Sequence, residues 1–246
     1  MMPAGDWLRA AEALPETEDP RVVLGSGPSL LLAPHPDDES LGCGGLIAAA
    51  AEAGLPLRIE VVSDGGGSHP RLPRHVLRRL REAETRAAVA ALGLPATALG
   101  FLGLPDQAVP AAGPEFDRAV ATLLASGEPP ETILVSWQHD PHCDHAASFA
   151  IGAALARATG ARLLAYPVWG LAYAWPVPGF PLPPAPCMAA PPRGHRFGMA
   201  HWLPAKRAAI AAHASQAGQL AGGFTLPPAL LALADRPFEL LLECTP

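Results

Sequence analysis

One short segment combines a histidine with three acidic residues. Residues 34–39, with the sequence PHPDDE, directly follow the apolar stretch 29–33, which has the length and composition of a buried strand. Carboxylates are costly to bury unless a cation or water compensates their charge. Imidazole and carboxylate groups are both ligands of zinc. The segment therefore favours a metal site, and a solvated turn rich in Pro and Asp is the alternative.

A second segment has the same character. Residues 139–145, with the sequence HDPHCDH, follow the apolar stretch 133–137. If both apolar stretches are parallel strands, their carboxyl ends lie at the sheet edge where open α/β sheets bind ligands. A catalytic zinc takes three protein ligands and keeps one position open. The two segments together supply these ligands, and we predict one metal site built from both strand ends.

The spacing of these residues suggests hydrolytic chemistry. We expect His35 and Asp38, three positions apart, to bind one cation, with His145 completing the ligand set. Asp37 would then lie beside the metal without binding it. From there its carboxylate could accept a proton from a water whose pKa the metal has lowered.

The second segment offers further assistance. A histidinium at His142 would stabilise a developing oxyanion and could give a proton to the leaving group. Asp144 could orient an imidazole in the same pocket. Cys143 is interpreted as a bystander, because its neighbours offer a more complete ligand set. The predicted site would hydrolyse a neutral carbonyl compound.

Strands and helices alternate from residue 29 onward. The expected strands are 30–33, 57–62, 97–101, 132–136, 162–166 and 238–243, and the expected helices are 41–53, 75–92, 115–126, 146–159 and 204–214. This alternation predicts parallel strands joined by right-handed crossovers. The expected fold is therefore three-layer α/β, a mostly parallel sheet with helices on both faces.

The chain is expected to form one catalytic domain over residues 29–246, preceded by a leader helix and loop over residues 1–28. Eight prolines between residues 176 and 192 interrupt the alternation of strands and helices. Proline suits neither a helix interior nor a central strand. We interpret residues 175–192 as a rim or lid over the site, because the roughly 50 residues that follow are few for a second core.

Composition excludes several classes of protein. The chain is half apolar and only 16% charged, unlike a disordered or coiled-coil protein. Its formal charge of −6 argues against a nucleic-acid partner. No apolar stretch reaches the roughly 18 residues that span a bilayer, and no secretory signal is visible. Four scattered cysteines favour a reducing, cytoplasmic setting, and the sequence is compatible with a homo-oligomer.

The sequence APHPDDE at residues 33–39, together with HCDH at residues 142–145, resembles the zinc-dependent N-acetyl-sugar deacetylases of the PIG-L/LmbE type. The resemblance covers most of the chain. It implies an LmbE-like, Rossmann-like fold and the removal of an N-acetyl (N-acyl) group from an amino-sugar-containing small molecule, such as an N-acetylated glycoside or glycoconjugate. It implies Zn²⁺ as the cofactor, and other divalent transition metals suit the same ligands.

The resemblance also assigns roles to individual residues. It places the zinc ligands at His35, Asp38 and His145, and the general base at Asp37. The oxyanion-stabilising histidine falls on His142, with Asp144 as its supporting aspartate. The substrate-contacting arginine of an Arg-x-x-Glu helix falls on Arg81, and an acid near the sugar falls on Asp106. Residues 206–216 resemble a C-terminal helix signature. Cys143 departs from the pattern, since proline is common at that position.

The substrate contacts have plainer alternatives. Arg81 could pair with Glu82 or Glu84 on an exposed helix face, and Asp106 could be a turn residue. Ser68 and His69 end a loop that leaves a strand and could line the pocket. His69 could equally be a solvent-exposed histidine.

Two other functions fit parts of the pattern. A metal-dependent phosphoester hydrolase could use the acids to hold magnesium, although the histidines and the missing second ligand set argue against a two-metal site. A non-catalytic, metal-stabilised carbohydrate-binding module would need a closed four-ligand zinc. Asp37, an acid beside the metal with no ligand role, argues against that module.

Overall fold

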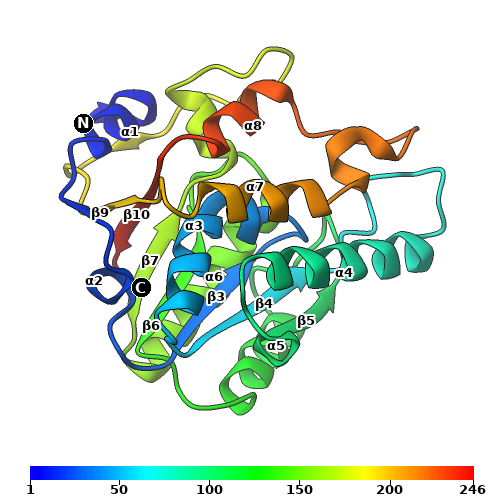
Figure 1. Cartoon of the computed structure of the whole chain (residues 1–246), viewed down its shortest axis with the longest axis horizontal. Helices are drawn as coiled ribbons and strands as arrows, with labels where there is room; N and C mark the ends of the chain where they lie inside the picture. Colours follow the sequence, from blue (N-terminus) through cyan, green and yellow to red (C-terminus); the bar gives the residue numbers. More distant parts are fainter.

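The computed structural model describes all residues, 1–246, and is built around one large β-sheet (Figure 1). The strands of this sheet are β2 (Glu16–Thr17), β3 (Ser29–Ala33), β4 (Leu57–Ser63), β5 (Leu99–Leu104), β6 (Thr132–Ser136), β7 (Arg162–Tyr166), β9 (Gly194–Gly198) and β10 (Phe238–Cys244). Their spatial order is β2-β9-β10-β7-β6-β3-β4-β5. The short strands β1 (Met2–Pro3) and β8 (Cys187–Met188) pair with each other.

Five adjacent strands, from β7 through β6, β3 and β4 to β5, are parallel. Strand β10 extends the sheet antiparallel to β7, and β9 lies antiparallel to β10. The mostly parallel sheet that the alternation predicted is confirmed. Strand β9, between β2 and β10, was not predicted, because its sequence GHRFG has glycine at both ends and no apolar run.

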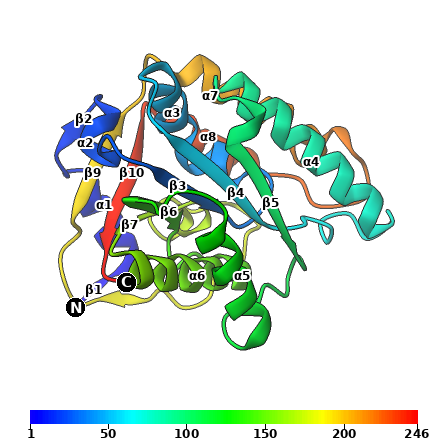
Figure 2. The same cartoon turned by 90° about the horizontal axis from the view of Figure 1, so that it is seen from below.

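Helices cover both faces of the sheet (Figure 2). They are α1 (Ala4–Ala11), α2 (Pro20–Leu24), α3 (Asp38–Glu52), α4 (Arg74–Ala91), α5 (Pro114–Ala125), α6 (Cys143–Thr159), α7 (Leu203–Ala212) and α8 (Pro228–Ala234), with the 3₁₀ helices η1 (Ala96–Ala98) and η2 (Trp169–Tyr173) and the π-turn η3 (Ser215–Gln219). Helices α3, α4 and α7 lie on one face, and α5 and α6 lie on the other. The predicted three-layer α/β fold is confirmed. No helix is both long and apolar enough to cross a bilayer.

The apolar run of β3 explains why this strand is central. Every residue of β3 is buried. Because successive strand side chains point to opposite faces, Leu31 and Ala33 pack into the core beneath α3, whereas Leu30 and Leu32 pack into the core beneath α6. A strand that is apolar on both faces fits only between two helical layers.

The strand order reverses beside β3. From β3 the chain moves outward through β4 to β5, then crosses back to place β6 on the other side of β3 and β7 beyond it. Such a reversal opens a crevice at the carboxyl ends of the two strands that flank it. The two acid- and histidine-rich segments follow β3 and β6, so the topology brings them together at this crevice.

The two helices that follow these strands begin earlier than predicted. Helix α3 begins at Asp38 instead of residue 41, and α6 begins at Cys143 instead of residue 146. The apolar periodicity starts only after the acidic residues, whereas acids in a first turn are stabilised by the helix dipole. As a result Asp38 and His145 project from rigid first turns.

A buried ion pair joins α7 to the sheet. The Lys206 ammonium contacts the Glu239 carboxylate at 2.7 Å, and that carboxylate also accepts hydrogen bonds from the backbone N–H groups of Gly45 and Leu46 in α3. The approach is close, since a Cβ on Gly44 would lie 2.7 Å from Cγ of Lys206. One carboxylate in β10 thereby connects helices α3 and α7.

Loss of this lysine is expected to destabilise the fold strongly. Lys206→Met leaves the Glu239 carboxylate buried without its counter-charge, which typically costs about 3–5 kcal/mol of unfolding free energy. Urea denaturation followed by circular dichroism measures the change. Arg207→Met, which removes an exposed pair with Asp235, is the matched control and is expected to leave the urea midpoint unchanged. Equal midpoints for both variants would contradict the role given to the buried pair.

Candidate active site

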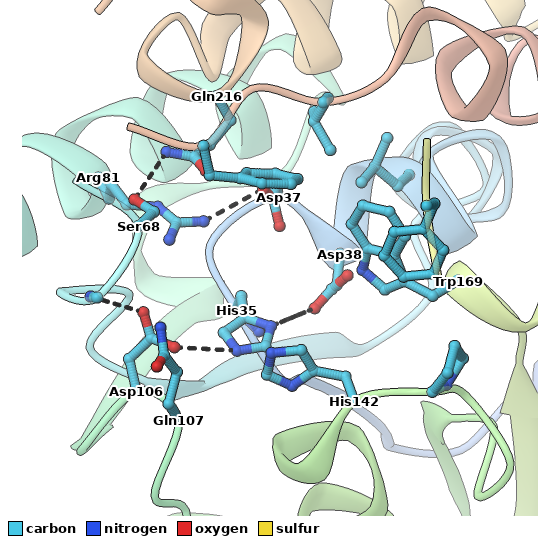
Figure 3. A pocket seen from close by; sticks show the side chains of 16 residues that line it. His35, Asp37, Asp38, Ser68, Arg81, Asp106, Gln107, His142, Trp169 and Gln216 are labelled. Carbon is cyan, nitrogen blue, oxygen red and sulfur yellow. Dashed lines mark hydrogen bonds and ion pairs between the residues drawn. The ribbon is translucent and has the colours of Figure 1, made fainter. Parts of the chain in front are cut away.

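The two segments meet in a cavity of about 380 Å³ at the carboxyl ends of β3 and β6 (Figure 3). The polar residues that line it are His35, Asp37, Asp38, Ser68, Arg81, Asp106, Gln107, His142 and Gln216. Its volume lies within the range of about 300–1,000 Å³ usual for small-molecule sites. Both segments contribute side chains to its wall.

Asp38 is the central contact between the two segments. Its Oδ2 atom lies 3.2 Å from Nδ1 of His35 and 3.2 Å from Nε2 of His145. All three side chains are buried. Although burial opposes ionisation, the charges of His145 and His35 hold the pKa of the Asp38 carboxyl far below its usual value. The chain therefore keeps a carboxylate between two imidazoles.

The remaining donor atoms allow more than one grouping. Three groups have one ligand atom per residue within 4.8 Å of one another: His35, His142 and His145; His142, Cys143 and Asp144; and His35, Asp106 and Asp144. The predicted set shares His35 and His145 with the first group, and its third member contacts both imidazoles. Cys143 lies within ligand distance of His142, although its side chain is exposed.

Nε2 of His145 lies 3.2 Å from Oδ2 of Asp38 but makes no hydrogen bond, although the side chain is fully buried. Buried imidazole nitrogens almost always have a partner. The opposite ring nitrogen, Nδ1, contacts the Asp140 carboxylate at 2.9 Å. A metal-binding histidine usually has one ring nitrogen held by a carboxylate and the other ring nitrogen directed at the metal site. His145 has this arrangement, with its free nitrogen facing the buried Asp38. The residues present therefore fit a divalent cation.

Asp144 contacts a different histidine than expected. Asp144 was expected to hold His142, but its Oδ2 lies 3.0 Å from Nε2 of His35. The same carboxylate accepts hydrogen bonds from the backbone N–H groups of Gln107 and Val109. Asp144, in the first turn of α6, therefore links His35 to the loop that follows β5. A sequence separation of 109 residues hides this contact from the sequence.

Asp37 has an unusual backbone conformation. Its φ is 139°, a value that side chains other than glycine rarely adopt. The strain is held in place by a hydrogen bond from the Asp37 N–H to Glu39, while Arg81 contacts the Asp37 carboxylate at 3.2 Å. Such strain concentrates at functional sites. Burial raises the pKa of the Asp37 carboxyl to about 7, against the opposing effect of Arg81.

A buried chain of polar groups lies behind Asp37. The Glu39 carboxylate accepts the Asp37 N–H through one oxygen and contacts Nε2 of His213 at 2.8 Å through the other. Ser40 donates to the same oxygen. His213, at the end of α7, thus fixes the acid that holds the Asp37 backbone.

The surroundings of His142 disfavour its protonation. Burial, with the neighbouring His35 and His145, lowers its pKa to about 4. The ring caps α6, because its Nδ1 accepts the backbone N–H of Asp144 at 3.2 Å. Nε2 must then carry the ring proton. With Nδ1 occupied by the helix cap, the structure favours a neutral N–H donor at His142, where the sequence suggested a histidinium.

The predicted substrate contacts fall into two groups. Arg81, Asp106 and Ser68 line the cavity, whereas His69 is buried behind Ser68 and bonds the carbonyl of Leu220. Arg81 does not pair with Glu82 or Glu84. Its guanidinium donates to Gly65 O, Pro36 O and Asp37. Asp106 contacts Nε2 of His35 at 3.3 Å and accepts the Gly67 N–H.

Sequence reasoning missed part of the cavity lining. Gln107, Phe180, Phe224 and Leu226 also line it. Gln107 has a φ of 66°, uncommon for a residue other than glycine. Phe180 belongs to the proline-rich segment, where no periodic pattern exists to assign its side chain. Only the interruption at residues 175–192 pointed to this region.

Residues 30–156 match the family model PIG-L, described as GlcNAc-PI de-N-acetylase. The match covers slightly more than half of the 246 residues and includes both segments. The chain belongs to the PIG-L family. The resemblance inferred from residues 33–39 and 142–145 is thereby confirmed. No curated protein matches the chain by sequence.

Solved structures share the fold of this PIG-L family member. The conserved protein TT1542 from Thermus thermophilus is 28% identical, with a TM-score of 0.56 over 76% of this chain and 79% of that one. The N,N'-diacetylchitobiose deacetylase from Pyrococcus horikoshii is 19% identical, with a TM-score of 0.58 over 81% and 73%. GalB, the 4-carboxy-2-hydroxymuconate hydratase from Pseudomonas putida, is 18% identical, with a TM-score of 0.59 over 89% and 97%. A hydratase among these structures means that the fold alone does not define the reaction.

Proposed function

We propose that this protein is a metal-dependent hydrolase that removes an N-acetyl group from an amino-sugar-containing small molecule. The observation that carries the proposal is the buried Asp38 carboxylate, 3.2 Å from a nitrogen of each of two histidines, with the strained Asp37 beside it. Family membership supports the reaction class. The amino sugar and its aglycone are not specified by these residues.

His35, Asp38 and His145 would hold the metal. Ligands of a tetrahedral zinc at about 2.0–2.1 Å lie roughly 3.3 Å apart, which matches the two 3.2 Å contacts of Asp38. Asp38 suits the third position better than His142, because a carboxylate offsets the charge of a dication. Zinc is the expected ion, and iron or cobalt would fit the same ligands. A bound metal supplies a Lewis acid that polarises the amide carbonyl and acidifies water.

Asp37 would act as the general base. Its carboxylate is free of ligand contacts and is held by the Arg81 guanidinium and by Glu39 through the backbone. It accepts one proton from the attacking water as the water oxygen bonds to the amide carbon. It then returns this proton to the departing nitrogen as the C–N bond breaks. The products are acetate and the free amino sugar.

His142 would stabilise the oxyanion with a neutral N–H. Its Nδ1 is occupied by the helix cap, so Nε2 is the donor available to the cavity. A fixed donor aimed at developing negative charge lowers the barrier without gaining or losing a proton. Asp144 and Asp140 would act as positioning residues for His35 and His145.

The charge of the cavity favours a neutral substrate over a phosphoester. Arg81 is the only arginine or lysine in the lining, and its guanidinium already donates to Asp37 and two carbonyl groups. Three aspartates line the same space. A phosphate would meet these carboxylates without a free cationic side chain to offset its charge.

The test is acetate release from a panel of N-acetylated glycosides, with the zinc-loaded protein and with the same protein after chelation. Acetate is expected only from the zinc-loaded protein, together with an equal amount of free amine. Phosphate release from phosphoesters, with no acetate from any glycoside, would overturn the proposal in favour of the phosphoester hydrolase.

Arg81→Lys is expected to lower kcat by up to about 100-fold, because a misplaced catalytic group loses rate steeply with distance. Lysine keeps the charge but cannot serve Gly65 O, Pro36 O and Asp37 at once. Steady-state kinetics measures the loss. Arg79→Lys, on the exposed face of the same helix, is the control. Equal kcat values for the two variants would show that Arg81 does not position Asp37.

A further inference from the structure

One wall of the cavity is aromatic. Trp169 and Phe180 are stacked, with ring centroids 4.5 Å apart and planes at 22°. Phe224 meets Trp169 edge-on at 5.8 Å and 65°. Figure 3 shows Trp169 on the side of the cavity opposite Ser68, Arg81 and Asp106, with Asp38 and His35 between. The reacting centre therefore lies between a polar wall and an aromatic wall.

The aromatic wall is fixed to the site. The backbone N–H of Trp169 donates to Asp140, the carboxylate that contacts His145. The N–H of Phe224 donates to Ser68 O, which anchors its loop to the polar wall. Three chain-distant segments supply the rings, and two of them are hydrogen-bonded to residues of the candidate active site. A ligand held against the rings is thereby placed relative to His35 and Asp37.

Phe224 is 38% exposed and is the only aromatic residue among the exposed large apolar side chains. Single exposed apolar residues are common, but this ring stands at a cavity that already contains two others. A ligand ring packed against it would remove apolar surface from water. The lining offers no free cation for an acidic group, so the group that packs there is neutral.

The volume and the shape of the cavity bear on which group of a substrate packs against the aromatic wall. A cavity of about 380 Å³ must also hold the sugar whose amide is cleaved, and it is near the lower limit of about 300 Å³ for small-molecule sites. The space beside the sugar is bounded by the flat faces of Trp169 and Phe180. Ring faces and edges also suit offset or edge-on contact with another ring.

We propose that the aromatic wall of Trp169, Phe180 and Phe224 is an aglycone subsite that selects N-acetylated amino sugars bearing a neutral, flat aromatic group. This inference rests on the proposed N-deacetylase function and names its substrate class. Phe224 is the specificity-determining residue most open to test, because its exposure makes substitution safe for folding.

The experiment compares acetate release from the methyl, n-octyl and phenyl β-glycosides of N-acetylglucosamine. The kcat/KM of the zinc-loaded protein is expected to be at least about tenfold higher for the phenyl than for the methyl glycoside. Phe224→Ala and Phe224→Leu should bring this ratio toward one, and Phe224→Tyr should retain it. Leu124→Ala, an exposed residue of α5 outside the cavity, is the control and should keep the ratio.

Equal kcat/KM for the phenyl and methyl glycosides would overturn the aglycone subsite and leave the deacetylase function standing. A preference for the octyl glycoside, or a phenyl preference untouched by Phe224→Ala, would also overturn it. If no glycoside releases acetate, the deacetylase function fails instead. Calorimetry with the phenyl and methyl glycosides then tests the subsite. The subsite requires that the phenyl compound bind more tightly than the methyl compound, and that Phe224→Ala abolish this difference.

Discussion

Asp37→Asn is expected to lower kcat for deacetylation by roughly 10²–10⁴-fold, the usual contribution of a general base. Asparagine has nearly the same shape and can accept a hydrogen bond from Arg81, but its amide cannot take a proton from water. Since Asp37 contacts neither His35 nor His145 in the structure, the variant should bind as much metal as the wild type. Acetate release and elemental analysis of the same sample measure both quantities.

The matched control is Asp117→Asn, which makes the same change at an exposed position of α5. It should retain wild-type kcat and metal content. An Asp37→Asn protein with full activity would eliminate Asp37 as the base. An inactive variant that has also lost its metal would instead make Asp37 a ligand, and the role of Asp38 would have to be reassigned.

Removal of the metal is expected to abolish activity and to lower the melting temperature by about 10 °C. Metal at 1,000 times its dissociation constant contributes about 4 kcal/mol of stability, and each kcal/mol shifts the melting temperature of a chain of this length by about 2–4 °C. In the structure the buried Asp38 carboxylate has only two imidazoles as counter-charges. Calorimetry before and after chelation, followed by re-addition of zinc, measures the shift and its reversal.

Histidine variants test the same site independently of chelators. His35→Ala and His145→Ala are expected to purify without metal and to lose both activity and the melting shift on zinc addition. His201→Ala, a histidine whose side chain is 73% exposed, should behave as wild type. A full metal complement in either buried-histidine variant would exclude that residue as a ligand. The two variants also separate His35 from His145 if only one of them binds metal.

Residues outside the cavity hold the backbone conformation of Asp37. Glu39 is fully buried and does not line the cavity. Its carboxylate accepts the Asp37 N–H and contacts His213. The strained φ of Asp37 therefore depends on side chains from α3 and from the end of α7. The residue proposed as the general base is thus positioned by side chains outside the cavity.

The sequence by itself determined the layers of the fold and the region of the site. The fully buried β3 and β6, with apolar side chains on both faces, could fit only within a sheet covered on both sides, and each is followed, after at most two residues, by a segment rich in histidine and acids. These signals are local: they depend on residue type and on periods of two or 3.6 residues. Consequently the sequence was enough to infer the alternation of strands and helices and the location of the site at the carboxyl edge of the sheet. It was also enough to infer that the site groups His35, Asp37, Asp38, His142 and His145.

The tertiary structure decided which side chains meet. It paired Asp144 with His35 instead of His142, made His142 a neutral helix cap, and directed Arg81 to Asp37. It also gathered Trp169, Phe180 and Phe224 into one wall from three segments. The contacts of Asp144 with His35 and of Arg81 with Asp37 join residues 109 and 44 positions apart, and such partners are chosen by the packing of whole elements. No local pattern encodes that choice, because the same residue types would satisfy it from many positions along the chain.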